Sequence, residues 1–312
     1  MDIFDLHCDT AFECERRKMD IDNGSTAVNL HTLSGRRWQC FAVFVPDKLR
    51  GAAALEHYCR VRDWLYRQCS LFPERIRLDG GNLDAADGRC TAVLTVESGA
   101  ALGGDPERVF SLHRDGVRMM TLTWNGDNEL ASGIGGSGGG LTDAGRSAVE
   151  NMRQCGMTVD VSHLGERGFY QLADMGVAVA ASHSCMRSVH GHRRNLTDEQ
   201  FAYIRDCGGV VGINFYSEFL GYGGDADAVY RHVSRALELG GENTLAIGSD
   251  YDGAEINEPL CSADCFEYLA DYLSGRGLDD IIINKMFCGN AQRMFAGTLR
   301  RDTNDLQQHK KQ

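Results

Sequence analysis

The sequence predicts an α/β protein built as a (β/α)8 TIM-like barrel. Short apolar, β-rich runs recur along the chain, and longer amphipathic stretches separate them. Continuous apolar strands alternating with helices are typical of a parallel sheet covered on both faces, and eight of them indicate a barrel. The length of 312 residues also suits one barrel. A doubly wound open sheet is the alternative, because strand counts from sequence can miss by one or two.

The expected elements follow in chain order. The eight strands are 3–7, 40–45, 91–97, 117–123, 157–163, 177–183, 209–214 and 245–250. Helix-like segments between them include 53–69, 142–156, 166–176 and 227–241. Thr142 is the expected N-cap of the second of these, and Gly156 is its expected C-terminal stop. We expect residues 1–300 to form a single barrel domain and 301–312 a polar C-terminal tail.

Composition and charge exclude several classes of protein. The net charge of −12 and the pI near 5.3 argue against a nucleic-acid partner. No stretch approaches the ~18 apolar residues of a membrane span, and the first residues lack a basic, then apolar, signal peptide. Twelve cysteines are scattered without a CxxC pair, which indicates reduced thiols. These features predict a cytoplasmic protein without a membrane partner.

Polar residues of the metal-ligating types end five of the eight expected strands. They are His7, Asp9, Glu97, His163, His183 and Asp250. Any one of them could simply cap a helix or a turn. In a barrel, however, the carboxyl ends of all strands converge on one rim, where active sites lie. We therefore expect these side chains to face one bowl.

The types of these side chains indicate the metal. Imidazole and carboxylate without thiolate suit Zn²⁺ or a similar divalent ion. Three histidines, one aspartate and one glutamate are more ligands than one open metal site needs. They suit two ions about 3.5–4 Å apart that share a carboxylate and a hydroxide. Glu97 is the natural bridge, because a carboxylate can offer one oxygen to each ion. His7 and Asp9 would then hold one Zn²⁺, and His163 and His183 the other.

Several longer motifs carry a resemblance over nearly the whole chain. They are DLHCDT (5–10), VESG (96–99), MTLTWNGDNELASG (120–133), GLTDAGRSAVENMRQCGMTVDVSH (140–163), ASHS (181–184), RRNLTD (193–198), GGVVGINFY (208–216), IGSDYDG (247–253) and GNAQRMF (289–295). In these motifs the chain resembles the membrane dipeptidase (renal dipeptidase) family of zinc metallopeptidases, and looks like a soluble bacterial-type member. The resemblance implies a barrel of the metal-dependent hydrolase type, a homodimer and two Zn²⁺ ions. It implies that the metal ligands are His7, Asp9, Glu97, His163 and His183, with Glu97 bridging the two ions.

The resemblance also implies two residues that handle substrate. Arg194 would bind the carboxylate of a dipeptide, which its planar fork suits. Arg193 competes for this role, and either arginine could instead be a solvated loop charge. Asp250 would contact substrate and assist proton transfer, although it could also merely cap the turn that follows it.

One position departs from the animal branch of the family. That branch has a histidine after TLT, thought to contact the reacting carbonyl, whereas this chain has Trp124. An indole N–H donates one hydrogen bond but cannot exchange protons. We therefore expect Trp124 to contact substrate and substrate preference to differ.

Two other patterns are set aside. The glycine run 132–140 contains a formal G-x-G-x-x-G, but it does not directly follow a strand, so a dinucleotide site is not predicted. A flexible loop over the barrel mouth is the better interpretation. His190 and His192 form an HxH pair in a polar loop, where surface histidines are expected.

The leading hypothesis is a binuclear zinc dipeptidase in which a metal-bridging hydroxide attacks the peptide carbonyl. Tolerance for a D-residue at the C-terminal position stays open. One alternative is a metal-dependent amidohydrolase acting on N-acyl amino acids or cyclic amides. The other is a non-catalytic binding protein on the same fold.

Overall fold

Parallel strands form the centre of the structure, which is a computed structural model and describes residues 1–81, 83 and 88–297. The strands are β1 (Ile3–Asp5), β2 (Arg37–Phe44), β3 (Ile76–Leu78), β4 (Cys90–Glu97), β5 (Val117–Thr121), β6 (Thr158–Asp160), β7 (Val179–Ala180), β8 (Val211–Ile213) and β9 (Leu245–Ile247). Eight of them pair in the order β7-β6-β5-β4-β2-β1-β9-β8, and all these pairings are parallel. A parallel bridge between Ala181 and Val211 joins the two ends of this order. The predicted eight-stranded barrel is confirmed, and the open sheet is wrong.

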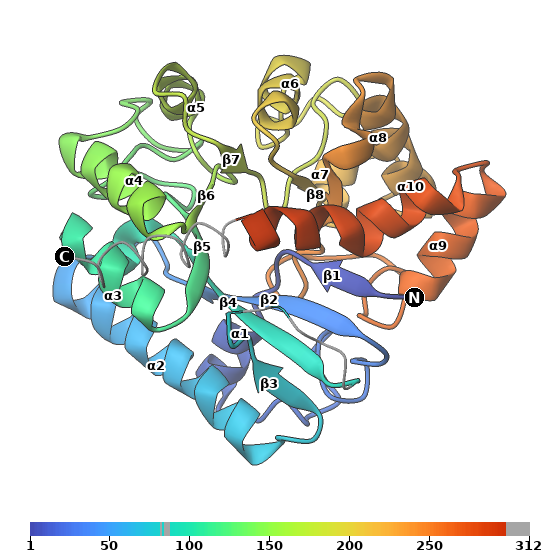
Figure 1. Cartoon of the computed structure of the whole chain (residues 1–312), viewed down its shortest axis with the longest axis horizontal. Helices are drawn as coiled ribbons and strands as arrows, with labels where there is room; N and C mark the ends of the chain where they lie inside the picture. Colours follow the sequence, from blue (N-terminus) through green and yellow to red (C-terminus); the bar gives the residue numbers. More distant parts are fainter. Residues whose placement is uncertain (82, 84–87, 298–312) are drawn as a thin grey trace, which may run out of the picture.

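Helices surround the strands (Figure 1). They are α1 (Thr10–Arg17), α2 (Gly51–Leu71), α3 (Val109–Arg114), α4 (Asp143–Cys155), α5 (Glu166–Asp174), α6 (Asp198–Asp206), α7 (Ser217–Leu220), α8 (Ala226–Glu238), α9 (Phe266–Gly275) and α10 (Asp280–Asn284). Short 3₁₀ turns lie at Gly99–Leu102, Pro106–Arg108 and Gly241–Asn243, and a π-helical turn follows α10 at Lys285–Gly289. Among the described residues, no helix combines the length and apolar character needed to cross a membrane.

The boundaries of α4 follow the two signals in its sequence. The side-chain oxygen of Thr142 accepts a hydrogen bond from the backbone N–H of Gly145 at 3.0 Å. Gly156 ends the helix in the left-handed conformation with φ 78°, which a residue without a Cβ adopts at little cost. Both predicted helix ends are confirmed. The predicted tail, 301–312, lies outside the described residues.

The strands differ from prediction mainly at their carboxyl ends. The first, fifth, sixth and eighth predicted strands reach the site residues, whereas β1, β6, β7 and β9 stop two or three residues earlier. His163 and Asp250 both have φ 66°, in the left-handed region, where a strand cannot continue. The ends of these strands are therefore turns that redirect side chains. The short strand β3, which pairs with β4 outside the order above, was not predicted.

An apolar cluster fills the barrel near the amino ends of its strands. It includes Phe4, Trp38, Val93 and Met119, together with Phe295 from the helical segment 290–297. The rings of Phe4 and Phe295 stack with centroids 5.3 Å apart. Figure 1 shows the red C-terminal helical segment crossing the strands beside β1. Because this end is packed with apolar side chains, the polar groups of the barrel gather at the opposite, carboxyl end.

Candidate metal centre

The structure brings six residues predicted from the sequence into one buried cluster. They are His7, Asp9, Glu97, His163, His183 and Asp250. Three overlapping trios have ligand atoms within 4.8 Å of one another. The trios are His7–Asp9–Glu97, Glu97–His163–His183 and His7–His183–Asp250. Two of the three contain Glu97, so the cluster has the connectivity of two neighbouring sites with a shared carboxylate.

Glu97, the last residue of β4, faces both halves of this cluster. Its Oε2 lies 3.5 Å from His7 Nε2, and that nitrogen lies 3.4 Å from Asp9 Oδ2. Its Oε1 lies 2.9 Å from His163 Nε2 and 3.8 Å from His183 Nε2. One carboxylate thus offers a different oxygen to each half, which is the arrangement of a bridging ligand.

Unpaired buried atoms show that a cation fits here. Among the described residues, His7 Nε2 and Asp9 Oδ1 have no hydrogen-bond partner although they are buried. The Nε2 atoms of His163 and His183 lie only 2.9 Å apart. His163 Nδ1 lies 2.9 Å from the side-chain oxygen of Asn125, an acceptor, so Nδ1 carries the proton and Nε2 keeps its lone pair. Converging lone pairs and unpaired carboxylate oxygens suit divalent ions.

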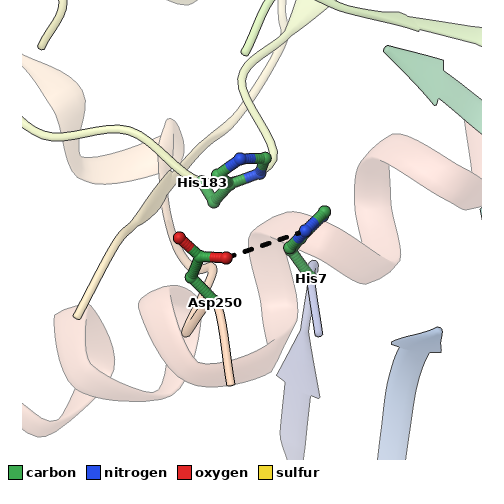
Figure 2. A group of neighbouring side chains, drawn as sticks. All are labelled: His7, His183 and Asp250. Carbon is green, nitrogen blue, oxygen red and sulfur yellow. Dashed lines mark ion pairs between the residues drawn. The ribbon is translucent and has the colours of Figure 1, made fainter. Parts of the chain in front are cut away.

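Asp250 joins the cluster from the turn after β9. Figure 2 shows its carboxylate facing His7, with Oδ1 3.9 Å from His7 Nε2, and the ring of His183 close by. Its other oxygen accepts a hydrogen bond from Asn214 Nδ2 at 2.9 Å. The turn then passes so close that a Cβ on Gly253 would lie 1.9 Å from Asp9 Oδ2. Only glycine allows the backbone to approach the centre at this point.

Burial changes the pKa values of the whole cluster. It raises the pKa of Glu97 to about 7 and that of Asp250 to about 6, and the charge of Asp9 adds to both effects. Burial lowers the pKa of His163 and His183 well below the ordinary histidine value. Both imidazoles are therefore neutral near pH 7, the form that binds metal. Burial would also lower the pKa of His7, but the neighbouring carboxylates of Asp9 and Glu97 raise it well above its usual value.

A cavity of about 620 Å³ opens onto the cluster. Its polar wall is formed by Asp9, Glu97, His163 and Asp250, and its apolar wall by Phe12, Phe44, Trp124, Tyr216 and Phe219. Trp124 also lines the cavity, and its ring lies edge-on to Phe44 with centroids 5.0 Å apart. This volume lies in the range of small-molecule sites.

The two candidate arginines have different surroundings. Arg194 is buried, and its guanidinium donates to Ser184 Oγ at 3.0 Å and to the backbone oxygen of His183 at 3.1 Å. It lies 5.5 Å from the ring of Phe219, which lines the cavity, but does not line the cavity itself. Arg194 Nε has no partner among the described residues. Arg193 is exposed, whereas Arg194 is buried against the backbone of the proposed ligand His183.

Sequence reasoning missed two asparagines that support the cluster. Asn125 orients His163, and Asn214 holds Asp250. Asn214 ends the seventh predicted strand, so the rule that found the other residues could have found it too. Asn125 lies within a long glycine-rich loop, and no local signal indicated its partner.

A parallel barrel with buried imidazoles and carboxylates at the carboxyl ends of its strands defines a metal-dependent hydrolase. Residues 1–308 match the family model for membrane dipeptidase, peptidase family M19. The chain therefore belongs to this family of dipeptidase metallopeptidases.

Individual relatives agree with this membership. An uncharacterized protein from the pqqA 5′ region of Klebsiella pneumoniae is 31% identical over 258 residues, which cover 75% of this chain and 95% of that protein. The crystal structure of dipeptidase AC, an M19 metallopeptidase, superposes with a TM-score of 0.88 at 26% identity, covering 97% of this chain and 98% of that one. A metallopeptidase from Rhodobacter sphaeroides, liganded with a phosphinate mimic of the dipeptide L-Ala-D-Ala, gives 0.86 at 25% identity, with 97% and 99% covered.

Proposed function

We propose that this protein is a binuclear zinc dipeptidase that hydrolyses the peptide bond of dipeptides. The observation that carries the proposal is the position of Glu97, whose two oxygens face two separate sets of ligands. His7 and Asp9 would hold one Zn²⁺, and His163 and His183 the other. When bound, such a pair of ions supplies an activated water and polarises the scissile carbonyl.

Asp250 is suited to move the proton in this reaction. It lines the cavity beside the cluster, and burial raises its pKa to about 6, close to the pH at which a general base works best. Asn214 fixes one of its oxygens, so the other oxygen stays directed toward the centre. We assign Asp250 the role of accepting a proton from the attacking water and passing it to the leaving amine.

Arg194 and the aromatic wall are suited to select the substrate. A buried guanidinium with an unpaired Nε, next to Phe219 at the cavity, would attract the one free carboxylate of a dipeptide. Trp124 and Phe44 would contact an apolar side chain of the substrate. The relative from R. sphaeroides was solved with an L-Ala-D-Ala mimic, which supports tolerance for a D-residue at the C-terminal position.

A substrate panel tests this function. Zinc-reconstituted protein is assayed with L–L dipeptides, L–D dipeptides, a tripeptide and an N-acetylated amino acid. We expect turnover of both kinds of dipeptide and little turnover of the tripeptide, whose carboxylate would lie one residue too far from Arg194. Hydrolysis of the N-acetyl amino acid alone would support the alternative amidohydrolase. Two bound ions without hydrolysis of any compound would support the non-catalytic alternative.

A further inference from the structure

A buried carboxylate and a serine form a relay beneath His183. Asp160, the last residue of β6, is 1% exposed. The hydroxyl of Ser182 donates a short hydrogen bond to Asp160 Oδ2, and Ser182 Oγ lies 2.7 Å from His183 Nδ1. Asp160, Ser182 and His183 thus form a continuous chain that ends at the proposed metal centre.

The direction of the hydrogen bonds in this chain decides which nitrogen of His183 carries the proton. An ionised carboxylate only accepts, so the single hydroxyl proton of Ser182 points toward Asp160. The hydroxyl oxygen must then accept from His183, which places the imidazole proton on Nδ1. The lone pair of Nε2, the atom that faces Glu97 and His163, is left free.

We propose that Asp160 and Ser182 are positioning residues that hold His183 in the tautomer required for metal binding. The inference rests on the proposed metal centre and deepens it. Asp160 also joins strand ends, because its Oδ1 accepts the backbone N–H groups of Ser162 at 2.9 Å and Ser182 at 3.0 Å. These backbone bonds fix which oxygen of the carboxylate faces the hydroxyl of Ser182.

A second pair of hydrogen-bonded aspartate and serine in the same barrel, Asp5 and Ser249, provides a matched control. Asp5 Oδ1 accepts the backbone N–H of Ser249 at 2.9 Å, and Asp5 Oδ2 accepts the Ser249 hydroxyl at 2.6 Å. Asp5 also accepts the backbone N–H of His7, two residues further on. As in the pair Asp160 and Ser182, the serine donates its backbone N–H to one carboxylate oxygen and its hydroxyl to the other. Ser249 Oγ also lies 3.1 Å from the backbone oxygen of His7, but it contacts no imidazole nitrogen. However, Ser249 precedes an aspartate, which has no tautomer to fix.

Asp160→Asn should keep this chain of hydrogen bonds but reverse the direction in which they donate. The Oδ1 position must remain an oxygen, because two backbone N–H groups point at it. The new amide NH₂ therefore occupies the Oδ2 position and donates to Ser182 Oγ. Ser182 Oγ then has two remaining neighbours, His183 Nδ1 at 2.7 Å and Ser162 Oγ at 3.3 Å. The shorter contact favours His183 as the acceptor of the serine proton, which moves the imidazole proton to Nε2 and blocks the ligand atom.

The test titrates metal-free protein with Zn²⁺ alone against a competing chelator and measures both dissociation constants. We expect Ser182→Ala and Asp160→Asn to weaken one of the two ions by about 10–100-fold, the usual effect of losing such an outer partner. Ser249→Ala should lose comparable thermal stability but keep both dissociation constants within about threefold of wild type. ¹⁵N NMR of histidine-labelled, metal-free protein should show His183 protonated on Nδ1 in the wild type and on Nε2 in Asp160→Asn.

Other outcomes would contradict either the positioning role or the proposed function. If Ser182→Ala and Asp160→Asn bind both ions as tightly as wild type, the positioning role is overturned. It is also overturned if Ser249→Ala weakens zinc equally, because general loss of packing would then explain the effect. Should Asp160→Asn fail to fold, Ser182→Ala and the wild-type tautomer decide alone. Wild-type protein that binds fewer than two ions would contradict the proposed function instead.

Discussion

Glu97 is the residue on which both proposed ion sites depend, because each of its oxygens faces a different set of ligands. Glu97→Gln keeps the volume of the side chain but replaces the anionic bridge with a neutral amide. We expect this variant to lose both ions, since each site is left with only two of its ligands. Elemental analysis after zinc reconstitution checks the result. Retention of one tightly bound ion would show that Glu97 serves a single site.

Asp250 is expected to transfer a proton during catalysis, but it is not expected to be needed for binding the two ions. An amide oxygen at this position can still accept the hydrogen bond from Asn214, so Asp250→Asn should keep the fold and both ions. It cannot accept a proton, and general acid–base catalysis contributes typically about 10²–10⁴-fold. We expect kcat to fall by about that factor. Activity within about tenfold of wild type, with two ions bound, would reduce Asp250 to a turn cap.

The neighbouring arginines allow a paired test of substrate recognition. Arg194→Ala should raise KM for dipeptides and lower kcat as well, if the carboxylate contact orients the scissile bond. The loss of a buried charge-assisted contact costs about 2–5 kcal/mol. Arg193 is exposed, so Arg193→Ala should have nearly wild-type kcat/KM. The reverse result, an inactive Arg193→Ala beside an active Arg194→Ala, would show that the assignment is wrong.

At the scale of elements, α8 contains a buried histidine that should make stability depend on pH. His232 Nδ1 accepts the backbone N–H of Met186 at 3.0 Å, and Nε2 donates to the backbone oxygen of Leu220 at 3.0 Å. Burial lowers the pKa of His232 to about 4. The folded state thus favours neutral His232, so its contribution is complete above the unfolded pKa of about 6.5 and is lost as pH falls toward 4.

This contribution amounts to about 3–4 kcal/mol, because the folded pKa lies about 2.5 below the unfolded value and each unit corresponds to about 1.4 kcal/mol. His232→Gln is a suitable variant, since its amide can make both hydrogen bonds but does not titrate. Chemical denaturation of metal-free protein at pH 7, 5.5 and 4.5 should show a smaller loss of stability in the variant. Identical pH dependence in the two proteins would contradict the assignment.

The elements that could be predicted are those with local signals. Thr142 and Gly156 mark the ends of α4 because capping and left-handed termination depend on one residue each. The carboxyl ends of the short strands could not be predicted. Their turns depend on long-range hydrogen bonds, such as those that Asp160 accepts from Ser182 after β7. Nothing in the local sequence distinguishes a strand that continues from one that ends on such a contact.

At the scale of the whole molecule, topology made the candidate site predictable. Parallel strands in a closed barrel place all their carboxyl ends on one rim, so polar residues at strand ends meet although they are far apart in sequence. That reasoning identified the six clustered residues but not Asn125, which comes from a loop and reaches His163 across 38 positions. The homodimer and the cytoplasmic location stay predictions from the sequence.

The ligands of the proposed centre come from the carboxyl ends of four strands, β1, β4, β6 and β7, which are far apart in the sequence. Zinc should therefore hold distant parts of the chain together and bind the folded state far better than the unfolded chain. A ligand at about 1,000 times its dissociation constant stabilises by about 4 kcal/mol. We expect zinc to raise the Tm of metal-free protein by several degrees, measured by calorimetry, and to leave the Tm of Glu97→Gln unchanged. Two ions bound without any rise in Tm would mean that the unfolded chain binds them equally well, so a preformed centre in the barrel would be contradicted.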